Sequence, residues 1–345
     1  MTLRRRIIRI LLILLLLPPI LAGVAGWLVA PSFLKPIRRE LTPDLIREAD
    51  ASFAHSGGHR EDFNVTAPDG ITLRSWIVRP TNPNGNWVIL FHGVADNRVG
   101  VIGQSEFLLR AGYSIVMMDA RAHGASDGQL ATYGWLERND TKSIIDALFK
   151  LQPVGAGLVY PEPRRTPPSQ ASSPESLTSS TSSTSPSHIF ALGESMGAGI
   201  ALQSAGADPR IEAVVAEAAF ANLREATYDY AGLRRSPLLG KTLFAPFSWM
   251  LMYRGEKLTG IPVAEVSPEK AVAARAFPVL LICDGNDDAL PCRHTQRTYA
   301  AAMGRKQLWE VPGAFHTAAL GFQPAEFQRR VLDFYANVAH TKPVQ

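Results

Sequence analysis

Cysteine is scarce in this sequence, and its scarcity excludes several classes of protein. The 345 residues include only Cys283 and Cys292, too few for a small fold held together by disulfides. One bridge in an oxidising compartment is an alternative, but we favour a buried free Cys283 and an unpaired Cys292. The chain also lacks a Cys/His cluster with metal-ligand spacing and a glycine-rich phosphate loop, so we expect neither a metal nor a cofactor.

A net basic charge is lacking outside the N-terminus, although the whole chain carries a net charge of +4. Residues 1–40 hold seven basic side chains and one acidic one, a net of +6, which leaves −2 for the remainder. A mildly acidic body offers no basic footprint for a polyanion. Nucleic acid is therefore not expected as a partner.

Long apolar runs are also rare, with one exception at residues 10–30, which carry no charge. As a helix at about 1.5 Å per residue, this run covers the roughly 30 Å of a bilayer core. Four arginines precede it, which favours a basic cytoplasmic N-terminus (1–9), a single-pass transmembrane anchor (10–30) and an extracytoplasmic body, periplasmic or at the cell surface. The alternative is a cleaved signal peptide with a small-residue site at 23–25, but the run is long for one.

The remaining chain alternates between strand-like and helix-like segments. We expect a connector at 31–62 and a domain at 63–340, opening with a hairpin around Pro68-Asp69-Gly70. Such alternation predicts an α/β fold with a mostly parallel central sheet and helices on both faces. Further strands are expected at 87–91, 113–118, 189–192, 211–216, 278–283 and 307–311, and helices at 132–151, 196–205 and 324–339.

Two segments depart from this alternation. Residues 153–187 include a stretch in which 10 of the 19 residues from Ser169 to Ser187 are serine and 3 are threonine. This composition buries too little apolar surface to offset its ordering entropy, so we predict a disordered insertion. Residues 220–275 are instead rich in aromatic residues and methionine, which predicts a small cap shaping an apolar pocket. An ordinary helix pair with an extended loop is the alternative.

The strongest chemical motif is Gly193-Glu194-Ser195-Met196-Gly197, a G-x-S-x-G pattern between an apolar strand and a small-residue helix. A serine on so sharp a turn has a strained backbone and an exposed Oγ. The N-terminus of the following helix favours an anion beside it. Ser195 is thus predicted to be a nucleophile.

A serine nucleophile needs a base, and the base needs a group to orient it. His316, in the loop after the last strand, is the predicted base because ligands bind at the carboxyl ends of parallel strands. The acid is expected in the loop after the strand at 278–283. Asp284 is too close to the strand end, whereas Asp287 and Asp288 are both plausible by reach.

An oxyanion formed during acyl transfer needs two backbone donors. The N–H of Met196, next to the nucleophile, and that of Val94, after Gly93, are the predicted pair. The polar residues Asp119, Arg121 and His123 are interpreted as a network that holds a neighbouring turn.

From about Phe63 to Ala339, these motifs resemble the α/β-hydrolase superfamily, and within it the serine-aminopeptidase-like and esterase-like branch. The family commonly has its acid three residues after the loop glycine, which implies Asp288, yet Pro291 has the usual spacing from Asp287, which stays the alternate acid. Ala122 and the long Ser/Thr-rich insertion depart from the family pattern. The resemblance rests on 91–93, 119–126, 193–198, 284–288 and 313–316.

This resemblance implies a serine hydrolase with a catalytic triad that cleaves an ester, thioester or amide through an acyl-enzyme. We expect a membrane-anchored enzyme, esterase- or lipase-like, that acts on a small-molecule or peptide acyl substrate. A serine aminopeptidase-like peptidase is one alternative. A non-catalytic α/β-hydrolase-like binding scaffold is the other, since a fold does not prove activity.

Overall fold

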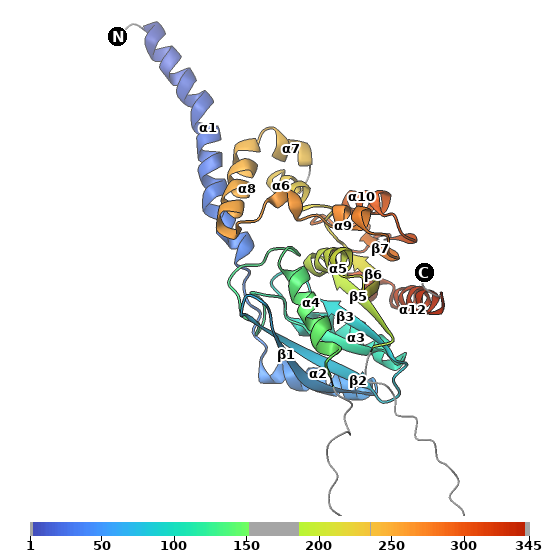
Figure 1. Ribbon diagram of the computed structural model, residues 1–345. Helices are drawn as coiled ribbons and strands as arrows, with labels where there is room; N and C mark the ends of the chain where they lie inside the picture. Colours follow the sequence, from blue (N-terminus) through green and yellow to red (C-terminus); the bar gives the residue numbers. More distant parts are fainter. Residues whose placement is uncertain (1–2, 152–185, 235, 342–345) are drawn as a thin grey trace, which may run out of the picture.

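The computed structural model describes residues 3–151, 186–234 and 236–341. These form one eight-stranded sheet in the order β1-β2-β4-β3-β5-β6-β7-β8 (Figure 1). The hairpin β1–β2 is antiparallel and β2 pairs antiparallel with β4, whereas all pairs from β4 to β8 are parallel, which confirms the predicted mostly parallel sheet. The strands are Gly58–Thr66 (β1), Thr72–Pro80 (β2), Asn86–Phe91 (β3), Ser114–Met118 (β4), His188–Glu194 (β5), Ile211–Glu217 (β6), Val279–Asp284 (β7) and Lys306–Val311 (β8).

Helices cover both faces of the sheet because its central strands are apolar on both sides. Along β3, Ile89 faces one core with Ile144 of α4 and Ala198 of α5, while Leu90 faces the other with Phe327 of α12. The covering helices are Pro43–His55 (α2), Ile102–Arg110 (α3), Glu137–Leu148 (α4), Met196–Ala207 (α5), Pro268–Ala274 (α9), Arg293–Ala301 (α10) and Pro324–His340 (α12), with the short Arg98–Val101 (η1) and Ala319–Phe322 (α11).

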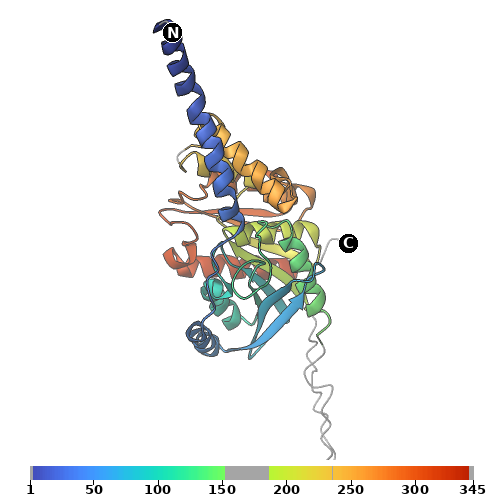
Figure 2. The same ribbon diagram turned by 90° about the vertical axis from the view of Figure 1, so that its left-hand side faces the viewer.

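A long N-terminal helix, α1 (Leu3–Leu34), projects from one end of the body (Figures 1 and 2). It is long and apolar enough to cross a membrane, a property that a signal sequence shares. Its last turns pack on α8 (Ala245–Thr259), which belongs to a group of helices after β6 with α6 (Leu223–Ala231), α7 (Pro237–Lys241) and the short η2 (Val263–Glu265). We call α6, α7 and α8 the cap helices. They lie within the segment 220–275 that was predicted to form a cap.

Two predictions, about a helix boundary and about cysteine pairing, differ from the structure. The helix expected at 132–151 begins only at Glu137. The Glu137 carboxylate accepts hydrogen bonds from the N–H groups of Thr132 (2.7 Å) and Gly134 (2.8 Å), and these bonds hold the two residues in a turn before the helix. The preference for unpaired cysteines was wrong. The start of α10 returns Cys292 to the end of β7, where it forms a disulfide with Cys283 across a Cα–Cα distance of 5.2 Å. The insertion predicted at 153–187 lies, apart from its last two residues, outside the described residues.

Candidate active site

Ser195 occupies the turn between β5 and α5 in a strained conformation, with φ 53° and ψ −119°. The turn is possible only with glycine on either side. A Cβ on Gly193 would lie 2.4 Å from the carbonyl oxygen of Gly197, and a Cβ on Gly197 would lie 2.2 Å from that of Phe91. The G-x-S-x-G pattern thus produces a tight elbow with the serine at its tip.

His316 joins the serine to an aspartate. Its Nε2 lies 2.8 Å from Oγ of Ser195, which donates a hydrogen bond to it when the ring carries its proton on Nδ1. That Nδ1–H then donates to Oδ2 of Asp287 at 2.6 Å. The loops after β5, β7 and β8 therefore bring together a serine hydroxyl, an imidazole and a carboxylate in the geometry of a Ser-His-Asp triad.

The preference for Asp288 as the partner of His316 is corrected by this geometry. The Asp288 side chain is 86% exposed and faces Arg234 at 4.0 Å, whereas the Asp287 side chain is fully buried. Asp287 also accepts the N–H groups of Ala289 and Leu290 through its other oxygen, both at 2.8 Å. These bonds turn the short loop so that Asp287 points inward and Asp288 outward.

The two amides predicted to hold an oxyanion lie at loops beside the serine. Met196 is the first residue of α5, where the helix itself offers no carbonyl to its N–H. Val94 follows Gly93, on which a Cβ would lie 3.8 Å from Cβ of Ser195. The His92 ring holds this loop, with Nδ1 2.7 Å from the Gly93 oxygen and Nε2 accepting from the N–H of Ala120.

Three buried carboxyl groups lie at the ends of neighbouring strands, and sequence reasoning missed their role. Asp284 on β7 accepts the N–H of Thr317 at 2.8 Å, and Glu217 on β6 accepts the N–H of Ala319 at 2.9 Å. Both bonds fasten the loop that carries His316. An acidic residue at the end of each of three consecutive buried strands, including Glu194 on β5, was the available signal.

Burial raises the pKa of each of these carboxyl groups by disfavouring its charged form. The pKa is raised to about 7 for Glu194 and to about 6 for Asp284, and well above its usual value for Glu217. Neighbouring carboxylates add to the effect, while a hydrogen bond of 3.0 Å from Nε2 of Gln104 opposes it at Glu194. The acidic groups behind the triad thus retain protons at a pH where exposed carboxyls are ionised.

The polar residues after β4 serve their own loops. Asp119 is buried against Arg98 (2.6 Å), and Arg121 pairs with Asp140 of α4 (2.6 Å). Asp119 also accepts the N–H of Ala125 at 2.7 Å. These bonds hold the turn beside the site, in the role given to them from the sequence.

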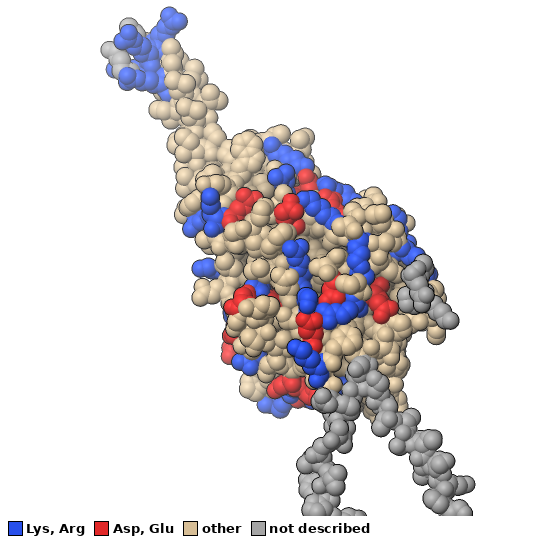
Figure 3. Space-filling model, in the orientation of Figure 1, with Lys and Arg blue, Asp and Glu red and all other residues tan. Residues whose placement is uncertain are grey.

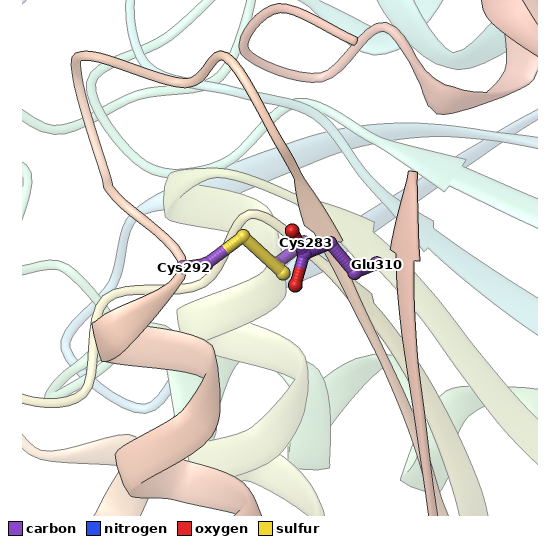
Figure 4. A group of neighbouring side chains, drawn as sticks. All are labelled: Cys283, Cys292 and Glu310. Atoms are coloured by element: carbon purple, nitrogen blue, oxygen red, sulfur yellow. A yellow bond between two sulfur atoms is a disulfide. The ribbon is translucent and has the colours of Figure 1, made fainter. Parts of the chain in front are cut away.

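Among the described residues, Cys283, Cys292 and Glu310 are grouped closely enough to be considered as metal ligands (Figure 4). The two sulfurs are joined to each other, however, and a metal requires the thiolate form. With the disulfide formed, only the carboxylate of Glu310 remains as a ligand. The disulfide is a structural cross-link beside the loop that carries Asp287.

Comparisons with known proteins show a hydrolase family. A model of the X-Pro dipeptidyl-peptidase (S15) family matches residues 54–246. The uncharacterized protein YqkD of Bacillus subtilis (strain 168) is 26% identical over 279 residues, covering 80% of this chain and 79% of YqkD.

Two solved structures share the fold. The Pyrococcus furiosus esterase Pf2001 aligns with a TM-score of 0.61 at 22% identity, over 88% of this chain and 99% of the esterase. The Pyrococcus horikoshii acylaminoacyl peptidase aligns with a TM-score of 0.58 at 13% identity, over 84% of this chain and 43% of the peptidase. At these identities the likeness concerns the fold alone.

Proposed function

The chain belongs to the X-Pro dipeptidyl-peptidase (S15) family of the α/β-hydrolase superfamily, and from this premise we propose that it is a membrane-anchored serine hydrolase with esterase activity. The observation that carries the proposal is the continuous hydrogen-bonded line from Ser195 through His316 to Asp287. A serine hydroxyl becomes a competent nucleophile when a base accepts its proton, and this line supplies the base.

In the proposed mechanism, Oγ of Ser195 attacks the acyl carbon while Nε2 of His316 takes its proton. Asp287 holds the Nδ1–H and stabilises the imidazolium that forms. The N–H groups of Met196 and Val94 bind the oxyanion. His316 then gives its proton to the leaving oxygen, and a water molecule, activated by the same ring, hydrolyses the acyl-enzyme and restores the serine.

We place ester ahead of peptide substrates because of the carboxyl groups beside the serine. A dipeptidyl-peptidase must hold the substrate's terminal ammonium, for which an accessible carboxylate is suited. Glu194, Glu217 and Asp284 are buried, and burial raises the pKa of each. A peptidase activity is the second candidate, supported by the description of the family itself.

We further propose that α1 is retained as a membrane anchor. Gly23, the first residue of the small-residue site at 23–25, and Gly26, directly after that site, both lie against α8, so the packed helix continues across it. The intact mass of protein extracted from membranes tests this directly. A mature chain that starts near residue 26 would show α1 to be a cleaved signal.

Activity is tested by labelling the full chain, in detergent, with a fluorophosphonate probe that reacts with activated serines. We expect labelling of the wild type and of the exposed-loop variant Asp288→Asn, and none of Ser195→Ala or His316→Ala. Absence of labelling in a folded wild type would favour a binding scaffold. Rates on matched p-nitrophenyl esters and aminoacyl p-nitroanilides then separate the two candidate activities, and faster turnover of the anilides would favour the peptidase.

A further inference from the structure

The part of α1 that is both uncharged and free of other protein is too short to cross a bilayer core on its own. Side chains from Ile10 to Leu21 are exposed, whereas Gly23 and Gly26 are buried against α8. Residues 3–9 are also exposed, but four of them are arginines. The free uncharged stretch is therefore about 18 Å long at about 1.5 Å per residue, against a bilayer core of roughly 30 Å. A spanning α1 must therefore carry some of its α8-packed turns into the membrane, and α8 with them.

Aromatic and basic groups mark where the apolar core would end. The Trp27 ring lies 6.3 Å from that of Tyr253, and the Arg254 guanidinium lies 4.8 Å from the Trp27 ring and donates to the Trp27 carbonyl oxygen. Trp, Tyr and Arg gather at membrane–water boundaries, since each has an apolar body and a polar end. A boundary at Trp27 gives a core of about 25 Å from Ile10 to Gly26, close to the required thickness.

The cap helices and their connection carry large apolar side chains that are exposed. Leu238 (64% exposed), Leu243 (68%) and Trp249 (60%) extend from α7, from the α7–α8 connection and from α8. α1 projects from the end of the body that the cap helices form, and the uncharged surface of α1 continues onto that end (Figures 1 and 3). Lys257 of α8 lies 5.5 Å from the Tyr253 ring centroid and can meet anionic lipid headgroups, whereas Lys241 of α7 is paired with Glu225 at 2.8 Å.

We propose that α7 and the first half of α8 are inserted at the boundary between the headgroups and the acyl chains of the leaflet beside α1, as a second membrane-binding element. The occupant of this surface is lipid rather than a second copy of the chain. α1 fixes the surface at the bilayer, and the packing of α8 on Gly23 and Gly26 places it at this boundary. Burying exposed leucine and tryptophan side chains there is favourable by roughly 25 cal/mol per Å².

An apolar cavity of about 160 Å³ lies between α1, α6 and α8, at the same end of the body. Its lining includes Phe33 of α1, Tyr230 of α6 and Leu251 of α8. A cavity of this size and lining accepts a short apolar group, about as large as benzene. This step rests on the proposed function: the substrate is an ester carried by a bilayer lipid, with a short apolar group of the substrate entering this cavity from the leaflet.

Membrane insertion is tested with the full chain in vesicles of anionic and zwitterionic lipids brominated along the acyl chain, which quench nearby tryptophan fluorescence. In the wild type, the fluorescence of Trp249 should be quenched, more strongly by bromines near the headgroups than by bromines deep in the acyl chains, and Trp249→Phe should remove this quenched component. The matched variant Trp309→Phe, at a buried position on β8, should remove a fluorescence component that the bromines do not quench. Leu238→Trp should add a quenched component, which covers the case in which Trp249→Phe fails to fold.

Unquenched fluorescence from Trp249 and from Leu238→Trp would overturn the proposal, and dimer cross-links through α8 would then assign the surface to a second copy. Quenching needs no turnover, so an inactive protein still gives a result.

The substrate class is tested by a separate variant. Leu243→Glu should slow hydrolysis of a vesicle-embedded ester about tenfold and leave hydrolysis of a short soluble ester unaffected. Met303→Glu, at another exposed apolar position, should change neither rate, and equal loss in both Glu variants would refute the lipid substrate.

Discussion

Oδ2 of Asp287 lies 2.6 Å from Nδ1 of His316, and the second oxygen of the same carboxylate accepts two backbone N–H groups at 2.8 Å. The carboxylate is held from both sides. It fixes the ring of His316 in the tautomer that leaves Nε2 free to accept the proton of Ser195.

The two neighbouring aspartates should therefore differ sharply when each is changed to asparagine. Asp287→Asn is expected to lower kcat about 10⁴-fold, because an amide can donate to Nδ1 and stabilise the wrong tautomer. Asp288→Asn should stay within about twofold of the wild type, since its side chain faces solvent. The measurement is kcat on a soluble p-nitrophenyl ester. The reverse order of the two effects would restore Asp288 as the acid.

Local patterns were enough to predict the sheet, the elbow and the position of His316. A central strand such as β3 is apolar on both faces, and a serine between Gly193 and Gly197 has few other conformations open to it. Each of these features is encoded within a few consecutive residues. The parallel order of the strands then brings their terminal loops to one edge without further information.

The choice between Asp287 and Asp288 was not encoded in the same way. Which of two adjacent side chains points inward depends on the path of the whole loop, and that path is set by the amides of Ala289 and Leu290 and by Cys292 folding back onto Cys283. The packing of α1 on α8 is equally non-local. This packing brings Gly26 against the backbone of Phe247, and the two residues are more than two hundred positions apart in the sequence.

The Cys283–Cys292 disulfide closes the loop that contains Asp287, so breaking it should affect both stability and activity. Closing a loop of this length stabilises the folded state by about 2–3 kcal/mol. Cys292→Ala is expected to lose that stability and to reduce kcat about ten- to a hundredfold as the carboxylate loses its position. Thermal melts and ester turnover, with and without dithiothreitol, measure both effects. The reductant should change the wild type only, and a wild type indifferent to it would contradict a role for the bridge.

The buried carboxyl of Glu194 should make stability fall as pH rises. Its pKa is about 7 in the folded protein, raised by burial, against 4.5 as the ordinary value, so the folded state binds more protons between these limits. The stability that this group contributes is fully present below about pH 4.5 and is lost as the pH rises to about 7. The loss lowers the free energy of unfolding by at most ~3 kcal/mol. Glu194→Gln should therefore melt several degrees above the wild type at pH 8 and close to it at pH 4.5.

A second Glu→Gln change provides the control for this pH effect. Glu326 is partly exposed, and its pKa is lowered to about 2 by Arg329 and Arg330. In the folded protein it stays ionised from pH 4.5 to 8, and the unfolded side chain titrates only near the lower limit, so Glu326→Gln should leave the pH trend of the wild type unchanged above about pH 5.5. Parallel melting curves for Glu194→Gln and the wild type across this range would show that Glu194 is ionised throughout.

Gly26 allows α1 to approach α8 at backbone distance, and a side chain there should separate the two helices. A Cβ on Gly26 would lie 2.2 Å from the carbonyl oxygen of Phe247 and 2.9 Å from its carbonyl carbon, and a backbone cannot yield as a flexible side chain can. Overpacking of this kind costs about 1–3 kcal/mol. Gly26→Leu should therefore increase amide hydrogen exchange in α8 about tenfold or more, measured on the full chain in nanodiscs.

Val24→Leu is the matched control, since Val24 lies on the same helix but is 50% exposed. It adds apolar bulk away from α8 and should leave exchange in α8 as in the wild type. Protection of α8 that is unchanged in Gly26→Leu would mean that α1 does not rest on the cap in the membrane. Increased exchange in both variants would instead assign the effect to α1 itself. Selective exposure of α8 in Gly26→Leu would show that this glycine couples the anchor to the cap helices, and through them to the apolar cavity that both border.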